Sequence, residues 1–269
     1  MIYKFIQREK GPVCYGISRC KNPKAVIVFT HGLTADSTMF EKQTEYFKDI
    51  CDVIVWDVPC HGLSRPYSDF SYRETALALN DIFIAENIEK AVLAGMSMGG
   101  YPCQFFRDMF ALKVVGFIGI DTTPVGLKYY SKSDIFWLKQ VEWMANCFSA
   151  KLLKQSMAAS VSATAYSKNK MLDMLDKSDK KEIVKQMGLA YGQFIKENRD
   201  IRFDFPMLLL CGEKDSTGKV KHYCKKWAED TGRPLVFIKG AKHFSNGDNP
   251  RQVNSEIEKF INELNRIQI

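Results

Sequence analysis

Short, continuous apolar runs that alternate with helix-forming segments are the feature that most limits how this 269-residue chain can fold. In chain order the runs are KAVIVFTHG, DVIVWD, KAVLAGM, VVGFIGID, FPMLLLCGEKD and PLVFIKG. An apolar run without polar alternation is typical of a strand that is buried on both faces. Because strands and helices alternate, the pattern predicts an α/β fold with a mostly parallel central sheet and helices on both of its faces.

The segments around these runs supply further elements. Two N-terminal strands are predicted at residues 2–7 and 13–20, joined by a turn at Gly11 and Pro12. Ser71 and Asn249 are residue types suited to cap the first turn of a helix. Helices are predicted at residues 38–50, 71–87, 98–112, 220–230 and 250–268.

One stretch interrupts the alternation. Residues 127–200 contain no buried-strand run, no repeat and no Gly/Ser-rich linker, but they do contain helical stretches at residues 136–148, 152–165, 169–175 and 180–197. We therefore expect residues 1–126 and 201–269 to form an α/β core and residues 127–200 to form an inserted α-helical cap. Ligands of open α/β sheets bind beyond the carboxyl ends of the strands, so a cap that leaves from such an end would cover the binding site.

Composition and charge argue against several other classes of protein. Hydrophobic residues make up 46% of the chain and charged residues 26%, which is typical of a globular domain. The net charge of +7 is spread along the chain rather than gathered in a basic block with interleaved aromatic residues, so no nucleic-acid partner is expected. The apolar runs are far shorter than the about 20 residues that cross a bilayer, and no transmembrane segment or signal peptide is predicted.

The spacing of cysteines and histidines bears on compartment and cofactors. The eight cysteines are scattered, and the sequence contains no C-x-x-C or H-x-H pattern. Scattered cysteines within apolar runs are typical of small buried hydrophobic residues in a reducing compartment. The sequence therefore predicts a cytoplasmic protein without a metal site or an organic cofactor, and it does not specify an oligomeric state.

A serine flanked by glycines follows one of the apolar runs. The segment LAGMSMGGYP places Ser97 between Gly95 and Gly99, at a turn from a strand into a helix. A nucleophile in such a turn projects its hydroxyl clear of the sheet, and the tight turn requires small residues two positions away on each side. The following helix adds the positive end of its dipole. The pattern predicts that Ser97 is a nucleophile; the alternative is a glycine-rich turn with a passive serine.

A serine hydroxyl needs a base, and that base must be oriented by a carboxylate. His243 lies downstream of the serine in a loop after a predicted strand, whereas His222 falls on a predicted helix. His243 is therefore the expected base. Asp215 follows the strand run FPMLLLCG, so its carboxylate is expected at the same edge of the sheet and is the first choice for the acid. Asp121 and Glu213, which also follow strand runs, remain alternatives.

The chain resembles the α/β-hydrolase superfamily of serine hydrolases, and within it the esterases, lipases and lactonases that have a helical cap. The stretches that carry the resemblance are FTHGLTAD, WDVPCHGLS, GMSMGG, CGEKD and GAKHF. The resemblance implies that the backbone amides of Leu33 and Met98 form an oxyanion hole. It also implies that the loop at residues 57–64 is mainly architectural and that His31 and His61 orient loops.

These residues together predict a serine hydrolase of the carboxylesterase type, which cleaves small-molecule esters of small to medium apolar acyl groups through an acyl-enzyme. Hydrolysis of a lactone, a thioester or a carbon–carbon bond by the same residues is an alternative, and so is a ligand-binding receptor on a hydrolase fold. The candidates for the substrate pocket are apolar cap side chains and one methionine beside the serine: Met96, Phe136, Trp137, Trp143, Met144 and Phe148.

Overall fold

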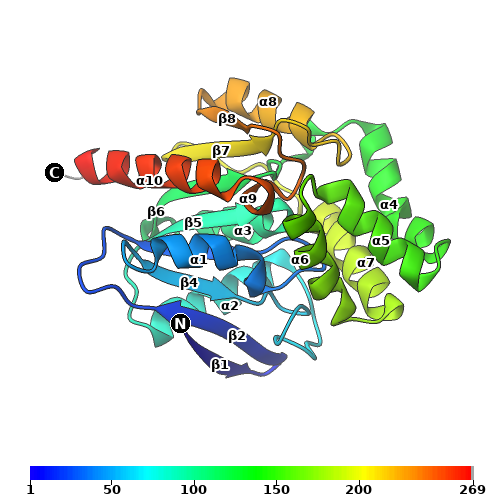
Figure 1. Cartoon of the computed structure of the whole chain (residues 1–269), viewed down its shortest axis with the longest axis horizontal. Helices are drawn as coiled ribbons and strands as arrows, with labels where there is room; N and C mark the ends of the chain where they lie inside the picture. The colour runs from blue at the N-terminus through cyan, green and yellow to red at the C-terminus, as the bar shows by residue number, and fades with distance from the viewer. Residues whose placement is uncertain (268–269) are drawn as a thin grey trace.

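The computed structural model describes residues 1–267, which contain one eight-stranded sheet (Figure 1). Its strands are β1 (Ile2–Arg8), β2 (Gly11–Ser18), β3 (Val26–Thr30), β4 (Asp52–Trp56), β5 (Ala91–Met96), β6 (Val114–Ile120), β7 (Met207–Gly212) and β8 (Leu235–Ile238). The spatial order is β1-β2-β4-β3-β5-β6-β7-β8. From β4 to β8 all neighbouring pairs are parallel, whereas β2 is antiparallel to both β1 and β4. The predicted mostly parallel sheet is confirmed.

The helices follow the strands in the alternating order that the sequence predicts. The α-helices are α1 (Glu41–Phe47), α2 (Tyr72–Ala85), α3 (Gly100–Met109), α4 (Lys132–Asn146), α5 (Ala150–Val161), α6 (Ala165–Asp176), α7 (Lys180–Glu197), α8 (Val220–Thr231), α9 (Ser245–Asp248) and α10 (Pro250–Ile267). Short 3-10 turns are η1 (Ser37–Phe40), η2 (Ser97–Gly99), η3 (Ala111–Lys113) and η4 (Leu127–Tyr129). The predicted end of the last helix, Gln268, lies outside the described residues.

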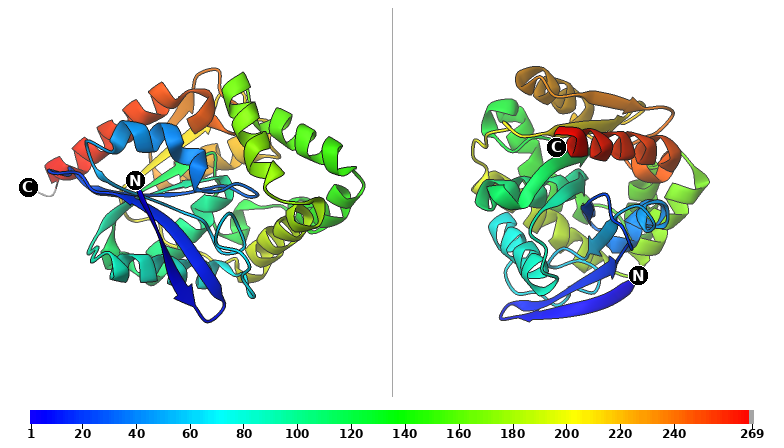
Figure 2. Two further views of the ribbon diagram at one scale, coloured as in Figure 1. Left: turned by 60° about the horizontal axis from the view of Figure 1, so that its bottom comes forward. Right: turned by 90° about the vertical axis from the view of Figure 1, so that its left-hand side faces the viewer.

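Helices cover both faces of the sheet, and each face has its own buried layer. Figure 2 shows α1 and α10 on one face and α2 and α3 on the other. Successive side chains of a strand point to opposite faces, so in β3 Ile27 and Phe29 pack into the layer of α1 and α10, while Val28 packs into the layer of α2 and α3. This two-sided burial explains why the central strands read as uninterrupted apolar runs.

The N-terminal hairpin forms as predicted, but its turn lies two residues earlier in the chain than predicted. Arg8 pairs with Gly11, so Glu9 and Lys10 make the turn, and Pro12 becomes a strand residue opposite Gln7. The pairing of β2 with β4 begins only at Tyr15, so the missing N–H of Pro12 interrupts no bond on that side. The prediction of a turn at Gly11 and Pro12 was therefore wrong.

Helices α4 to α7, called the cap here, follow β6 and lie together at one end of the molecule (Figure 1). Polar contacts tie the cap to the core: Lys177 Nζ lies 2.6 Å from Asp36 Oδ2, and Gln186 Nε2 donates to Cys60 O at 2.8 Å. The division of the chain at residues 126 and 200 stays a prediction. Within residues 1–267, no helix combines the length and the apolar character required to cross a membrane.

The packing of β3 against its covering helix generates a stability prediction. Phe29 is fully buried, with its ring centroid 4.8 Å from that of Phe40 and 6.2 Å from that of Phe47. Because truncation leaves a cavity between sheet and helix, Phe29→Ala is expected to lower the free energy of unfolding by about 3–5 kcal/mol. Denaturant titration followed by circular dichroism measures this. Leu112→Ala, at a site that is 87% exposed, is the control and should change stability by less than about 0.5 kcal/mol; equal effects would contradict the packing argument.

Candidate active site

Ser97 stands at the turn between β5 and α3 in a conformation that the glycines around it make possible. Its φ angle is +51°, in the left-handed region that non-glycine residues rarely adopt and that costs on the order of 1–3 kcal/mol. A Cβ atom on Gly95 would collide with the backbone of Gly99, and a Cβ atom on Gly99 would collide with the carbonyl of Thr30. The glycines are needed because strand, turn and neighbouring strand approach too closely for side chains.

The neighbouring strand holds this turn in place. Thr122, just after β6, donates a hydrogen bond from Oγ1 to the carbonyl oxygen of Ser97 at 2.6 Å. A Cβ atom on Gly100 would collide with the same threonine side chain. The turn is therefore fixed from both sides, and the Ser97 side chain faces the cavity described below.

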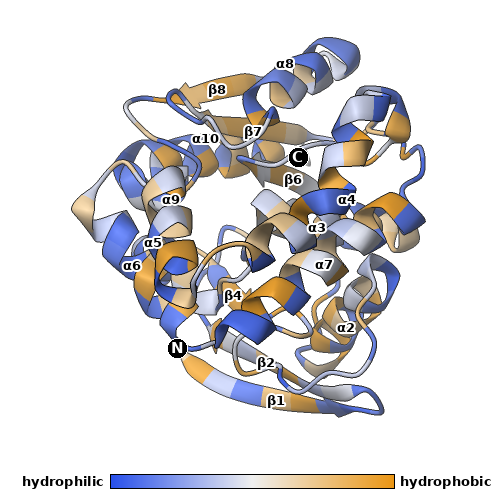
Figure 3. Ribbon diagram, turned by 90° about the vertical axis from the view of Figure 1, so that its right-hand side faces the viewer, coloured by the Kyte–Doolittle hydropathy of each residue, from blue (hydrophilic) through white to orange (hydrophobic). Residues whose placement is uncertain are grey.

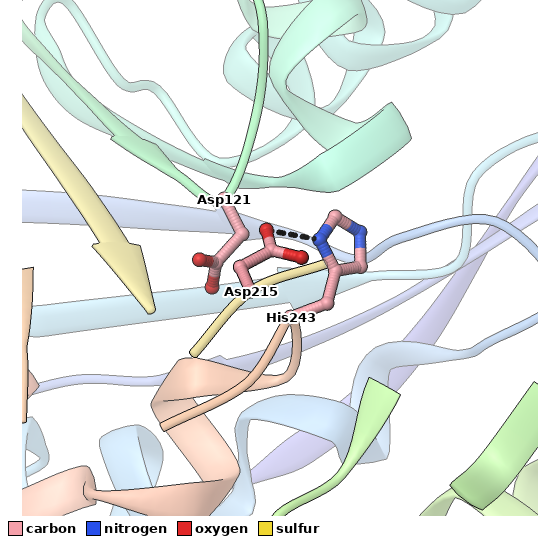
Figure 4. A group of neighbouring side chains, drawn as sticks. All are labelled: Asp121, Asp215 and His243. Carbon is pink, nitrogen blue, oxygen red and sulfur yellow. Dashed lines mark hydrogen bonds and ion pairs between the residues drawn. The ribbon is translucent and has the colours of Figure 1, made fainter. Parts of the chain in front are cut away.

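Ser97, His243 and Asp215, which lie far apart in the sequence, form one chain of hydrogen bonds. Ser97 Oγ is 2.8 Å from His243 Nε2, and His243 Nδ1 is 2.8 Å from Asp215 Oδ2. Figure 4 shows Asp215 after β7 and His243 in the loop after β8, with the imidazole turned toward the carboxylate. With Asp215 ionised, Nδ1 donates to it, which leaves Nε2 free to accept from the serine hydroxyl.

Burial and charge act against each other on this pair. Burial disfavours the charged imidazole, but the hydrogen bond to Asp215 and the negative charges of Asp215 and Asp121 outweigh it, so the pKa of His243 is raised. Burial likewise opposes ionisation of Asp215, yet hydrogen bonds from His243 and from Thr217 N hold its pKa below the ordinary value. The geometry therefore favours an ionised acid beside a histidine of increased basicity.

The two alternative acids occupy other positions. Glu213 Oε2 accepts from Gly240 N at 2.8 Å, away from the histidine ring. Asp121, at the end of β6, is fully buried; it accepts from Gly212 N at 2.6 Å and from the hydroxyl of Ser245. Burial raises the pKa of Asp121 to about 7, against the opposing influence of His243.

Asp121, Asp215 and His243 place possible metal-ligand atoms within 4.8 Å of one another. Each of these atoms already has a hydrogen-bonding partner in the protein: the two side chains Asp215 and His243 bond each other, and Asp121 is bonded by Gly212 N and Ser245. A cation would have to displace these donors. The group is better described as a buried hydrogen-bonded cluster, drawn in Figure 4.

Leu33 and Met98 line the same cavity as the serine. The loop that carries Leu33 is held by His31, whose Nε2 accepts from Val58 N at 3.0 Å and whose Nδ1 lies 2.7 Å from Gly32 O. Because Nε2 accepts, Nδ1 carries the proton and donates to the carbonyl. Burial lowers the pKa of His31 and so favours this neutral form. The role of the Leu33 and Met98 amides as oxyanion donors stays a prediction.

Hydrogen bonds hold the loop at residues 57–64 in place, both within the loop and to neighbouring segments. Asp57 accepts from Ser37 N and from Leu63 N, both at 2.7 Å. Ser64 Oγ donates to Asp57 O at 2.6 Å and accepts from Cys14 N at 2.8 Å. These contacts join the loop to the strand β2 and to η1, as expected of an architectural element.

A cavity of about 640 Å³ lies between the carboxyl ends of the strands and the cap, and Ser97 and His243 reach it. One wall consists of methionines that pack with the α1 and α10 layer: Met39, Met96, Met157, Met171 and Met187. The other wall is aromatic and packs with the α2 and α3 layer: Tyr72, Tyr101, Tyr130 and Phe194. The inner surface is thus largely apolar on both sides.

The predicted pocket residues divide into two groups. Met96, Trp137 and Met144 line the cavity. Phe136, Trp143 and Phe148 are not among the residues that line it, which corrects the prediction for these three.

Helical geometry explains the division. On α4 the cavity-facing positions 134, 137, 138, 141 and 144 are separated by three, one, three and three residues, the spacing of one helix face. Phe136 and Trp143 are two turns apart on another side of the helix. Phe148 lies beyond the end of α4, in the connection to α5.

Several cavity residues were not identified from the sequence. One missed set is on α7, where Met187, Ala190, Tyr191 and Phe194 line the cavity. Their spacing of three, one and three residues marks one face of a helix, and this signal was available in the sequence. The tyrosines from α2 and α3 carried no comparable signal, because a buried tyrosine on a core helix is as easily explained by packing.

Proteins of known structure or curated function resemble this chain over most of its length. A 2-succinyl-6-hydroxy-2,4-cyclohexadiene-1-carboxylate synthase from Citrobacter koseri is 24% identical over 250 residues, which cover 87% of this chain and 93% of that protein. A thermophilic esterase from Thermogutta terrifontis has a TM-score of 0.80 at 19% identity, covering 98% of this chain and 100% of the esterase. A variant of an N-acyl homoserine lactonase bound to N-hexanoyl homoserine lactone has a TM-score of 0.79 at 17% identity and covers 98% of each chain.

At such identities the structural similarities show a shared fold alone. The sequence profile of one family, however, described as the alpha/beta hydrolase family, matches residues 27–256 and so spans both parts of the core and the cap between them. The match includes the serine turn, the acid and the histidine loop. This chain therefore belongs to the alpha/beta hydrolase family.

Proposed function

We propose that the protein is a serine hydrolase that cleaves carboxylic esters with small to medium apolar acyl groups. The observation that carries the proposal is the hydrogen-bond chain from Ser97 Oγ through His243 to Asp215, with 2.8 Å at each step. This order of nucleophile, base and orienting acid is what acyl transfer by a serine requires. The open side of the serine hydroxyl faces a cavity large enough for a small-molecule ester.

The reaction then proceeds in two halves. Ser97 Oγ attacks the ester carbonyl while His243 Nε2 takes its proton, and Asp215 stabilises the imidazolium. The Leu33 and Met98 amides hold the oxyanion, and loss of one such donor typically costs about 3 kcal/mol of barrier. His243 returns the proton to the departing alcohol oxygen. Water, deprotonated by His243, attacks the acyl-enzyme, and release of the carboxylic acid restores the serine hydroxyl.

The lining of the cavity supports an apolar acyl group. Methionine side chains adapt to aliphatic chains of different shape. The aromatic wall is apolar in effect, because Tyr72 OH donates to Ala190 O at 3.0 Å and Tyr130 OH donates to Pro124 O at 2.7 Å. These hydroxyls are engaged within the protein, so the rings face the substrate without a free polar group.

Within residues 1–267, the lining next to Ser97 offers no unpaired lysine or arginine to the carboxylates in the product named for the Citrobacter koseri relative, so we place an uncharged ester group there. That name describes a molecule with carboxylates, for which basic side chains are the usual partners. Among the described residues, the lining of this cavity contains no arginine and one lysine, Lys219, which is paired with Asp134 at 2.7 Å. Lactones, the class named for several structural neighbours, differ from open esters only in that the leaving alcohol stays attached, and they are the second candidate.

Replacement of the serine tests the proposal directly. Ser97→Ala is expected to reduce kcat for 4-nitrophenyl butyrate by about 10³-fold or more, because the nucleophile is lost. A fluorophosphonate probe should label the wild-type protein once, at Ser97, by mass spectrometry, and should not label the variant. The control is an unchanged circular dichroism spectrum and melting temperature. Retained turnover in the variant would refute the assignment, and an unreactive wild-type protein would favour a receptor.

The raised pKa of His243 gives a pH dependence. The base must be neutral to accept the serine proton, so kcat/KM should rise with pH through a midpoint above the ordinary histidine value of 6.5. With a pKa of about 7, Asp121 is partly ionised near this midpoint, and its negative charge stabilises the imidazolium. Asp121→Asn removes that charge, so it should move the midpoint to lower pH.

Glu213→Gln is the matched control, because Glu213 bonds Gly240 N instead of facing the histidine. It should leave the midpoint of the kcat/KM profile unchanged. A midpoint that is the same in all three proteins would show that Asp121 does not act on the charge of His243.

The methionine wall predicts acyl-chain selectivity. Met171, on α6, is 5% exposed and lines the cavity. Met171→Trp fills part of the space, so the kcat/KM for 4-nitrophenyl octanoate should fall at least about tenfold relative to that for the acetate, a difference of about 1.4 kcal/mol in barrier. Phe136→Ala, on the outer side of the cap, should leave the chain-length profile unchanged. If the chain-length profile changed in the Phe136 variant and not in the Met171 variant, the assignment of Met171 to the cavity and of Phe136 to the outer side of the cap would be wrong.

A further inference from the structure

A second pocket lies on the outer side of the cavity at Ser97, between η4, α4 and α8. It has a volume of about 340 Å³ and is called the outer pocket here. Figure 3 looks onto this side of the molecule, where α4 and α8 lie near each other and the ribbon of α8 is mostly hydrophilic. The proposed mechanism uses none of the charged residues of this pocket.

The outer pocket and the cavity share a wall. Tyr130, Asp134, Lys219 and Tyr223 line both. The rings of Tyr130 and Tyr223 are 4.6 Å apart, and Lys219 Nζ lies 2.7 Å from Asp134 Oδ1. These four residues therefore lie between the two spaces, and two of them form an ion pair between the cap and the residue before α8.

The outer pocket is strongly cationic. Lys128, Lys219, His222 and Lys226 line it, and within the described part of the chain Asp134 is its one acidic lining residue. Asp134 is already occupied, since it accepts from the backbone and the hydroxyl of Ser131 as well as from Lys219.

Two of these lysines, Lys128 and Lys226, lie against the ring of Tyr129. Lys128 Nζ and Lys226 Nζ lie 5.2 and 5.5 Å from the centre of the Tyr129 ring. Lys226 Nζ also lies 3.4 Å from the carbonyl oxygen of Lys128. Among residues 1–267 neither ammonium group forms an ion pair with a carboxylate. Asp230 and Asp200 also lie near Tyr129, but neither forms an ion pair with these ammonium groups, so each lysine can engage an external anion.

We infer that the outer pocket binds an anionic end of the substrate, a carboxylate or a phosphate, while the ester carbonyl lies at Ser97 in the apolar cavity. This inference rests on the proposed function of Ser97. Lys219 can turn away from Asp134, because the Lys219 side chain is 56% exposed and Asp134, which is 14% exposed, keeps its hydrogen bonds from Ser131. A bound carboxylate or phosphate would pair with Lys219 in place of Asp134. It would also contact the ammonium groups of Lys128 and Lys226, which are suited to binding these anions.

Two matched substrate pairs separate the sources of the anion. Mono-4-nitrophenyl adipate and 4-nitrophenyl hexanoate differ by a terminal carboxylate. Butyryl-coenzyme A and its butyryl-N-acetylcysteamine counterpart differ by the phosphate-bearing portion. We expect the wild-type protein to prefer the charged member of at least one pair. In Lys128→Ala/Lys226→Ala, KM for that member should rise about five- to tenfold, since an exposed ion pair contributes up to a factor of about five. Its kcat, and both constants for the neutral member, should be unchanged.

The matched control is Lys139→Ala/Lys225→Ala, which removes the same amount of charge from α4 and α8 at exposed positions that do not line the outer pocket. It should leave all constants unchanged. Direct binding of adipate and of coenzyme A, measured by calorimetry, gives a readout that does not require turnover.

The outcomes distinguish this inference from the proposed function. Binding that weakens in the Lys128/Lys226 variant and not in the control supports the outer pocket even if no ester is cleaved, a result that would count only against the hydrolase proposal. The inference would be overturned if the wild-type protein had the same kinetic constants for the charged and neutral member of each pair and if all three proteins bound adipate and coenzyme A equally. Equal weakening in both double variants would overturn it as well, because it would reveal a general charge effect.

Discussion

The close approach of backbone segments at the end of β5 is the constraint on which the rest of the site depends. Gly95 and Gly99 leave no room for a side chain against each other or against Thr30. This contact forces the chain into a sharp turn and holds Ser97 at a positive φ. The strain is local, and the surrounding sheet and the hydrogen bond from Thr122 maintain it. The serine hydroxyl thereby stands clear of the strand ends.

The parallel sheet then brings polar groups from three neighbouring strands to the same place. Asp121, Asp215 and His243 follow β6, β7 and β8, and all are at most 5% exposed. Buried charges are costly unless they are hydrogen-bonded, and here backbone amides of Gly212 and Thr217 supply the bonds. The same bonds fix the direction in which the acids face the imidazole. They therefore determine both the orientation of the base and the negative charge beside it.

The cap covers this polar edge of the sheet. Its helices add walls that continue the two buried layers of the core, one rich in methionine and one aromatic. The lysines of the outer pocket lie beyond these walls, next to an ion pair rather than next to the serine. A substrate that is apolar at the reacting end and charged at the far end matches this distribution of surface.

The sequence by itself determined the class of fold and two of the three residues of the hydrogen-bonded chain, Ser97 and His243. Unbroken apolar runs specify strands that are buried on both faces, and small residues around Ser97 specify a turn that bulky residues cannot make. It left the acid open among Asp215, Asp121 and Glu213, because each follows a strand. Only the tertiary structure decided that Asp215 faces His243, since side-chain direction in a loop depends on contacts with other strands. Likewise, composition marked the cap as apolar, but the orientation of each cap helix on the core decided that Met144 faces the cavity and Trp143 faces away.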